Sequence, residues 1–107
     1  MFTRVVELVS KQGSARELST TINEKIVPIL KKQAGFVDEI VLVSDADSNR
    51  LLALSFWKTT EDAERYQREQ YKSVRDNLQS LLEAEPVVRT FEVHTSTGHK
   101  ITAGKAA

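Results

Sequence analysis

This chain of 107 residues contains two histidines, the side chains whose ordinary pKa lies closest to neutral pH. His94 lies in a predicted final strand, residues 87–95, on the same face as Glu92. An imidazole titrates near neutral pH, so His94 could take a proton from a substrate as a general base. Its other ordinary role is that of a surface or interface imidazole paired with Glu92. His99, in the C-terminal tail, is the weaker candidate of the two histidines.

Arg89 is the second candidate, on the opposite face of the same strand with Phe91 and Val93. A guanidinium in this apolar set could stabilise an anion. It could equally pair with a carboxylate across a subunit interface. The residues alone leave both roles open.

Composition excludes several classes of function. Fifteen basic residues balance fifteen acidic ones, so no net field favours nucleic acid or an anionic membrane. The chain has no cysteine, which removes disulfides, thiolate metal sites and cysteine nucleophiles. No stretch resembles a signal peptide or a membrane span, and we expect a cytoplasmic protein.

Metal sites and phosphate loops are also unsupported by the sequence. The segment DADSN, residues 45–49, begins like a calcium loop, but Arg50 stands at the sixth position and Phe56 at the twelfth, where glycine and glutamate are required. We interpret it as a hairpin turn and expect no metal ligands. Glycine-rich phosphate loops and nucleophile elbows do not occur.

The first half of the chain predicts a strand, a helix and a hairpin. Residues 2–10 alternate as a strand, and Ser14 with Glu17 forms a capping box at a helix start. Pro28 is expected to kink or restart this helix. The apolar stripe of the helix consists of Leu18, Ile22, Ile26, Ile29 and Leu30. Gly35 suits the left-handed residue that ends it.

The hairpin over residues 36–57 carries apolar side chains on both faces. Alternation places Val37, Val41 and Val43 on one face, and Phe36, Ile40 and Leu42 on the other. The returning strand has Leu51, Ala53 and Trp57 on one face, and Leu52, Leu54 and Phe56 on the other. Both faces of these strands therefore need cover.

The second helix has an irregular apolar pattern. Thr59 or Thr60 can cap it, and Ala63 and Tyr66 begin its apolar stripe. The next large apolar residue, Tyr71, lies five positions on, which is about 140° out of phase on a regular helix. We therefore expect a break or bulge between Gln67 and Tyr71, beside a ligand cavity.

The element order is β-α-β-β-α-β, a ferredoxin-like α+β fold with a four-stranded antiparallel sheet and both helices on one face. We assign residues 1–96 to this domain and residues 97–107 to a C-terminal tail. The other sheet face is apolar and no third helix covers it, so we expect a homodimer through the sheet faces.

Three segments resemble the antibiotic biosynthesis monooxygenase family, of the dimeric α/β-barrel superfamily. They are residues 13–18, with Gly13 and the Glu17–Leu18 pair, residues 35–37 (GFV), and residues 56–66 (FWKTTEDAERY). The family includes cofactor-independent oxygenases, haem-degrading enzymes and proteins of no known reaction. The resemblance therefore implies a fold more strongly than an activity.

In proteins of this family the ligand cavity lies between the helices and the sheet. The resemblance implies that Trp57, Tyr66 and Tyr71 converge there to position a small, flat, apolar or aromatic ligand, although aromatic residues at helical spacing more often serve core packing. Asn77 or Arg89 would polarise a substrate oxygen, and His94 would be the base. The implied reaction is cofactor-independent oxygenation of a quinol or polyphenol.

The same resemblance bears on cofactors. Haem-degrading relatives use a histidine in the second helix as the iron ligand, and this chain has none between Glu61 and Glu85. Asn77 and Tyr71 are the nearest polar substitutes. We therefore expect no cofactor. The alternative to an enzyme is a non-catalytic small-molecule-binding or regulatory module of the same fold.

Overall fold

The computed structural model of the chain describes residues 1–98. Its elements are β1 (Phe2–Val9), α1 (Ala15–Thr21), η1 (Ile22–Ile26), α2 (Val27–Lys31), β2 (Phe36–Val43), β3 (Arg50–Trp57), α3 (Thr60–Glu69), α4 (Tyr71–Leu78), η2 (Gln79–Leu81) and β4 (Val87–Glu92). The predicted β-α-β-β-α-β order is confirmed. The predicted tail, residues 97–107, lies mostly outside the described residues, as does His99, so that boundary stays a prediction.

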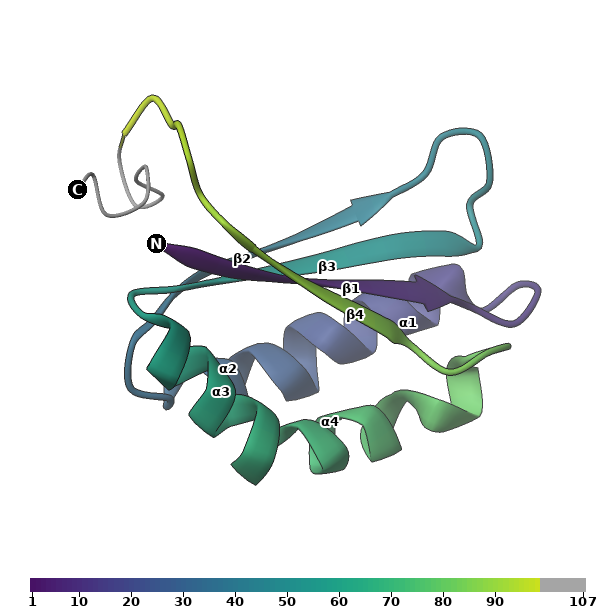
Figure 1. The fold of residues 1–107 in the computed structure, drawn as a ribbon. Coiled ribbons are helices and arrows are strands. Elements are labelled where there is room, and N and C mark those ends of the chain that lie inside the picture. The colour runs from purple at the N-terminus through teal and green to yellow at the C-terminus, as the bar shows by residue number, and fades with distance from the viewer. Residues whose placement is uncertain (99–107) are drawn as a thin grey trace.

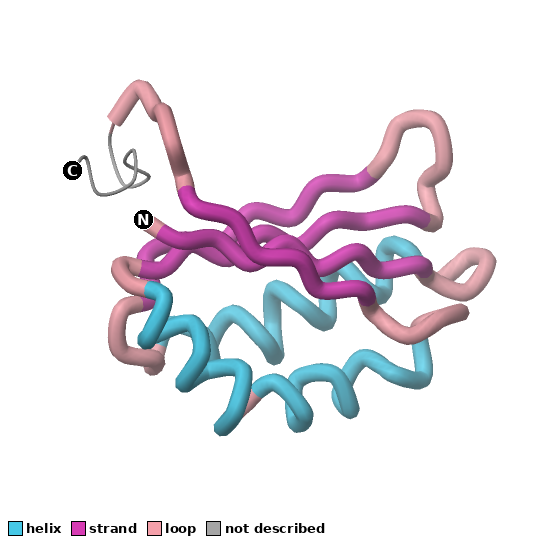
Figure 2. Tube along the Cα trace, viewed as in Figure 1, coloured by secondary structure: helices cyan, strands magenta, loops and turns pink. Residues whose placement is uncertain are grey.

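The four strands form one antiparallel sheet in the order β2-β3-β1-β4. All the helices lie against one face of it, and the other face has no helical layer (Figures 1 and 2). This is the predicted ferredoxin-like α+β fold. Among the described residues, no helix has the length and apolar character needed to cross a bilayer.

The core lies between the helices and the sheet. The first helical segment consists of α1, η1 and α2 and spans residues 15–31. Its buried side chains pack with Leu8 and Leu51 of the sheet; they are Leu18, Ile22, Ile26 and Leu30. The helix–sheet boundary is thus closed mainly by large aliphatic side chains, whose burial stabilises the fold.

The start of α1 differs from the prediction. Ser14 occupies the residue before the helix, but its side chain makes no capping hydrogen bond, so the predicted capping box is wrong. The backbone of Ser14 has φ −104° and ψ 2°, whereas a capping residue is typically extended and aims its oxygen at the free N–H groups.

The interruption predicted at Pro28 is confirmed. A π-helical segment, η1, precedes it, and Pro28 stands in the first turn of a new α-helix, α2. A proline has no N–H to donate, and the first turn of a helix is where that loss costs least. The chain therefore changes its helical hydrogen bonding before the proline.

The second predicted helix begins and breaks as expected. The side chain of Thr59 accepts a hydrogen bond from the N–H of Asp62 at 3.1 Å. The helix then divides into α3 and α4 at Gln70, whose φ of −121° is not helical. Tyr71 begins the new helix, so the predicted break between Gln67 and Tyr71 is confirmed.

One strand of the hairpin deviates from simple alternation. A bulge between Phe36 and Asp38 places Phe36 opposite Trp57, and their ring centroids lie 5.6 Å apart. Phe36 was predicted on the face of Ile40, and this prediction is wrong because the extra residue reverses the alternation at the strand start.

The helix-free face exposes large apolar side chains beside a charged cluster. Ile40, Leu42, Leu52, Val87 and Phe91 are exposed on it. Glu7 lies among them, 2.9 Å from Arg50 and 3.5 Å from Arg89. The face therefore combines apolar surface with ion pairs that water can reach.

Candidate functional site

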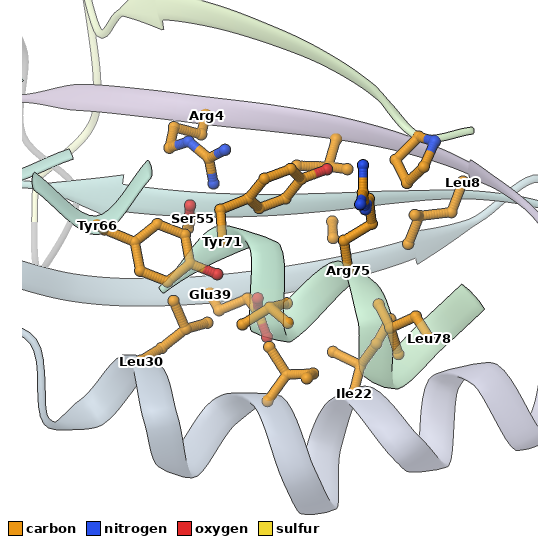
Figure 3. Close-up of a pocket in the computed structure, with 15 residues that line it drawn as sticks. Arg4, Leu8, Ile22, Leu30, Glu39, Ser55, Tyr66, Tyr71, Arg75 and Leu78 are labelled. Atoms are coloured by element: carbon orange, nitrogen blue, oxygen red, sulfur yellow. The ribbon is translucent and has the colours of Figure 1, made fainter. Parts of the chain in front are cut away.

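A small pocket lies between the helices and the sheet, where the sequence predicted a cavity (Figure 3). Its polar lining consists of Arg4, Glu39, Ser55, Tyr66, Tyr71 and Arg75, and its apolar lining includes Val6, Leu8, Ile22, Ile26, Leu30, Val74 and Leu78. The pocket has a volume of about 40 Å³. That space holds a few water molecules, whereas sites for drug-sized ligands measure roughly 300–1,000 Å³.

The polar lining is organised by the register of the sheet. Ser55 of β3 pairs with Arg4 of β1 on one side and with Glu39 of β2 on the other. These three side chains form one row across three strands, on the face that the helices cover. Two strand spacings of about 4.8 Å separate Arg4 and Glu39 along this row.

Arg4 is buried although it carries a positive charge. It is 3% exposed, and its guanidinium carbon lies 5.0 Å from the ring centre of Tyr66 and 4.8 Å from that of Tyr71. Its guanidinium also donates a hydrogen bond to the side-chain oxygen of Gln67. No carboxylate within residues 1–98 forms an ion pair with it. Burial lowers the pKa of Arg4 from its ordinary value.

Glu39 is the carboxylate of the pocket. Desolvation by burial, with a smaller contribution from the neighbouring charge of Asp38, raises its pKa from 4.5 to about 7. Within the described part of the chain, its carboxylate has neither a hydrogen-bond donor nor a cationic partner. Glu39 can therefore change protonation state near neutral pH.

The two tyrosines supply the aromatic wall. The break at Gln70 lets Tyr66 and Tyr71 both face Arg4, although they lie five positions apart. Burial raises the pKa of Tyr66 to about 12 and raises that of Tyr71 as well. Both hydroxyls are therefore neutral at physiological pH and act as hydrogen-bonding groups.

Trp57 packs against the ring of Tyr66 but does not line the pocket. It is fully buried, and its ring centroid lies 5.1 Å from that of Tyr66. Its indole N–H donates to the hydroxyl of Ser55 at 2.9 Å, so its polar atom already has a partner. Trp57 therefore contacts Tyr66 and Ser55 of the pocket without lining it.

Arg75 of α4 lines the end of the pocket near Leu78. Its terminal nitrogens lie 3.4 Å from Asp76 and 3.6 Å from Glu85, and its Nε is buried without a hydrogen-bond partner. Arg75 thus differs from Arg4 in being paired with carboxylates. Its positive charge is largely balanced by its neighbours.

A larger groove adjoins the pocket. It is lined by Phe2, Arg4, Thr60, Ala63, Glu64, Gln67, Val88 and Thr90, and has a volume of about 550 Å³. Arg4 lines both spaces, and its hydrogen bond to Gln67 joins β1 to α3 at their boundary. The contact between Arg4 and Gln67 therefore separates the inner pocket from an open space large enough for a small molecule.

Comparison with known proteins identifies the family of this chain. The sequence model of a family named antibiotic biosynthesis monooxygenase matches residues 1–72. This chain belongs to the antibiotic biosynthesis monooxygenase family. No curated protein sequence matches the chain significantly.

Solved structures show the same fold. SnoaB, a cofactor-independent oxygenase from Streptomyces nogalater, is 16% identical, with a TM-score of 0.77 over 92% of this chain and 97% of that one. The monooxygenase of the gene ActVA-Orf6 from Streptomyces coelicolor, in complex with nanaomycin D, is 17% identical, with a TM-score of 0.73 over 95% and 92%. A conserved protein from Methanosarcina mazei is 19% identical, with a TM-score of 0.70 over 85% and 91%.

The predicted catalytic residues of this family member do not meet in the pocket. His94 is exposed and lies beyond β4, which ends at Glu92 and not at residue 95 as predicted. Arg89 is exposed on the helix-free face beside Glu7. Asn77 is exposed on α4, where its amide donates to the backbone oxygen of Ser73 at 2.9 Å. Within one chain, none of the three lines the pocket.

Two predicted binding residues, Tyr66 and Tyr71, do line the pocket, while Arg4 and Glu39 were missed. The signal for both missed residues was present in the alternation of their strands. Arg4 alternates with Phe2 and Val6 on one face of its strand, and Glu39 shares the predicted face of Val41. A charged residue in an inward-facing apolar series is costly to bury, and such cost often marks a site.

The described residues offer no obvious metal centre. No three His, Cys, Asp or Glu side chains within residues 1–98 are grouped so as to hold a metal ion. Among the described residues that line the pocket, Glu39 is the group whose pKa is shifted to near neutral pH.

Proposed function

We propose that this protein binds a flat, largely apolar phenol or quinol in the pocket and oxygenates it without a cofactor. The observation that carries the proposal is Arg4, a buried cation with no carboxylate partner among the described residues, held on the faces of Tyr66 and Tyr71. A buried charge without a counter-charge is costly and becomes favourable when an anion binds beside it.

The reaction needs a negative charge to form twice. The substrate first loses a phenolic proton, and the resulting anion transfers an electron to O2. The ring radical and the reduced oxygen then combine at the carbon opposite the phenolic oxygen. One oxygen atom stays as a new carbonyl and the other leaves as water with the phenolic and ring hydrogens, so a phenol and O2 give a quinone and water.

Arg4 suits both charged stages. Its guanidinium lies against the rings of Tyr66 and Tyr71, and these contacts hold its charge in place as the substrate charge forms. Apolar side chains exclude water on the remaining sides, which strengthens the attraction between a cation and a developing anion.

Substrate entry requires movement. The inner pocket of about 40 Å³ cannot hold an aromatic bicycle, whereas the adjoining groove of about 550 Å³ can. Release of the hydrogen bond between Arg4 and Gln67 would join the two spaces. The structural neighbours support this class of ligand, because one is named as a cofactor-independent oxygenase and another was solved with nanaomycin D.

A homodimer through the helix-free sheet faces is part of the proposal. Leu42, Val87 and Phe91 on that face are 47%, 44% and 50% exposed, and burying them against a second copy would remove apolar surface from water. Glu7 with Arg50 and Arg89 would then lie at the interface, which is one of the roles left open for Arg89.

The alternative is a binding module without catalysis. The small volume of the inner pocket favours this alternative, because Tyr66 and Tyr71 occupy space that a substrate would need. In that case a ligand would stay in the groove beside Arg4, and O2 would not be consumed.

Trp57 provides the test, because it is the only tryptophan and contacts Tyr66. Its fluorescence is titrated with 1-naphthol and nanaomycin D, and O2 uptake is followed with 1-naphthol as substrate. Saturable quenching with O2 uptake supports the oxygenase, quenching without uptake supports the binding module, and no quenching with either compound contradicts both. Arg4→Met, which removes the buried cation, should abolish uptake.

A further inference from the structure

We propose that Glu39 is the proton acceptor of this site, taking the phenolic proton from a substrate whose phenolate charge is delocalised onto the opposite ring carbon, which faces Arg4. This inference rests on the proposed function and adds the group that the reaction lacks within one chain, because His94 lies outside the pocket. It assigns a catalytic role to a residue that the sequence did not single out.

The position of Glu39 carries the argument. Glu39 and Arg4 flank Ser55 in the row across the sheet, so a flat ring lying along this row has a carboxylate at one end and a cation at the other. Figure 3 shows Glu39 near Tyr66 on the side of the helix that carries Ile22 and Leu30, and Arg4 on the opposite side of the Tyr66 ring, next to Tyr71. A phenolic O–H at the end near Glu39 places the opposite ring carbon, where oxygen adds, toward Arg4.

Among the described residues, neither a basic nor a cationic side chain forms a hydrogen bond or an ion pair with the carboxylate of Glu39. The titratable groups on the elements around it are Asp38 of β2, Arg4 of β1, Tyr66 of α3, and Tyr71 and Arg75 of α4. The first helical segment contributes only Ile22, Ile26 and Leu30 to the pocket. The carboxylate of Glu39 therefore has open lone pairs directed at a partly dry space.

The protonation behaviour of Glu39 fits this role. With its pKa raised to about 7 by burial, Glu39 is a stronger base than an ordinary carboxylate, yet it is substantially ionised at neutral pH. A general base works best when its pKa lies near the working pH. The neutral tyrosines, with raised pKa values, cannot fill this role.

The proton transfer is balanced within the site. The substrate O–H bond breaks and its electron pair stays on the substrate oxygen as the phenolate charge. A new O–H bond forms on the carboxylate of Glu39, which becomes a neutral acid. The net charge of the pocket does not change, and Glu39 returns its proton to water when the product leaves.

A titration followed by carbon NMR tests the inference without relying on turnover. Protein labelled at the glutamate carboxyl carbons is titrated alone, with 2-naphthol, and with naphthalene, and the Glu39 signal is assigned from Glu39→Gln. We expect the Glu39 midpoint near pH 7 in the free protein. A bound phenol donating its O–H to the carboxylate should lower this midpoint, whereas naphthalene should not.

The outcomes separate the two proposals. If neither compound shifts any signal of the pocket, the proposed binding function is contradicted, and this inference falls with it. If 2-naphthol binds but moves the Glu39 midpoint no more than naphthalene does, only the role of Glu39 is overturned.

Kinetics provide the second readout. Glu39→Gln should lower kcat for 1-naphthol by at least about 100-fold with KM changed little, and the rising limb of the pH–rate profile near pH 7 should disappear. Glu39→Asp should restore part of the rate. The matched control is Glu24→Gln, an exposed residue of η1 that should keep the wild-type rate. An unchanged kcat in Glu39→Gln would overturn the inference.

Discussion

The guanidinium carbon of Arg4 lies 4.8 Å from the ring centre of Tyr71, and this contact depends on the break in the helical segment at Gln70. On a continuous helix Tyr66 and Tyr71 would point about 140° apart. With the break, both rings face the same cation. An irregular backbone thus builds the aromatic wall of the pocket.

Replacing Arg4 by methionine should change ligand affinity more than it changes the stability of the fold. We expect the free energy of unfolding of Arg4→Met to stay within about 2 kcal/mol of wild type, because removing a buried charge offsets the lost stacking. Ligand preference should change more. The wild type should bind 2-hydroxy-1,4-naphthoquinone, an anion at neutral pH, at least tenfold more tightly than neutral 1,4-naphthoquinone, and Arg4→Met should lose this preference. Equal affinities in the wild type would contradict the role of Arg4.

The stability of the protein should depend on Glu39 as pH rises. The pKa of Glu39 is raised in the folded chain from 4.5 to about 7, so unfolding releases a proton between these values. Below pH 4.5 the ionisation of Glu39 does not change the free energy of unfolding. Between pH 4.5 and about pH 7 it lowers the free energy of unfolding progressively. Glu39→Gln should therefore be more stable than wild type above neutral pH, by about 3 kcal/mol, and the difference should vanish in acid. Urea denaturation across this range measures it, and a difference independent of pH would refute the expectation.

Gly35 cannot carry a side chain without strain. Its φ is 81°, and an added β-carbon would lie 2.0 Å from the Oδ2 atom of Asp62. Gly35→Ala should cost at least about 2 kcal/mol in chemical denaturation, from the left-handed backbone and the overlap together. In the double variant Gly35→Ala/Asp62→Ala, the overlap with Asp62 is removed and the left-handed backbone strain remains. The double variant should therefore regain only part of the lost free energy of unfolding. A loss below about 0.5 kcal/mol in the single variant would show that this turn is less constrained than the structure indicates.

The helix-free sheet face should mediate dimerisation. Sedimentation equilibrium should give twice the chain mass of 12.0 kDa, and Val87→Glu should give the monomer mass because it places a charge in the apolar patch. Val43→Glu is the matched control, because Val43 is equally exposed but lies in the sheet row of Leu51, on the other face. A wild-type mass near 12.0 kDa would contradict the dimer.

The fold was predictable because its signals are local. Alternation defined the strands, the threonine cap at residue 59 defined the start of α3, and the phase slip before Tyr71 located the break. The capping box at Ser14 failed because residue types do not determine the backbone angles that aim a hydroxyl. The bulge after Phe36 was not foreseen because an inserted residue leaves no composition signal.

The site was predictable only in part. Tyr66 and Tyr71 were located by helical phase, but the row of Arg4, Ser55 and Glu39 depends on strand pairing across three strands. These three residues lie side by side because of the register in which the strands pair, and the sequence of one strand does not determine that register. His94 and Arg89 attracted attention by their chemistry, yet the end of β4 and the face of the sheet place them outside the pocket.

Turnover of 1-naphthol in O2 labelled with the heavy isotope tests the central claim most directly. The account predicts that the 1,4-naphthoquinone formed carries one labelled oxygen atom, that labelled water forms in equal amount, and that Arg4→Met yields neither. Product without label, or labelled product formed equally by wild type and Arg4→Met, would contradict oxygenation at the pocket of Arg4, Tyr66 and Tyr71.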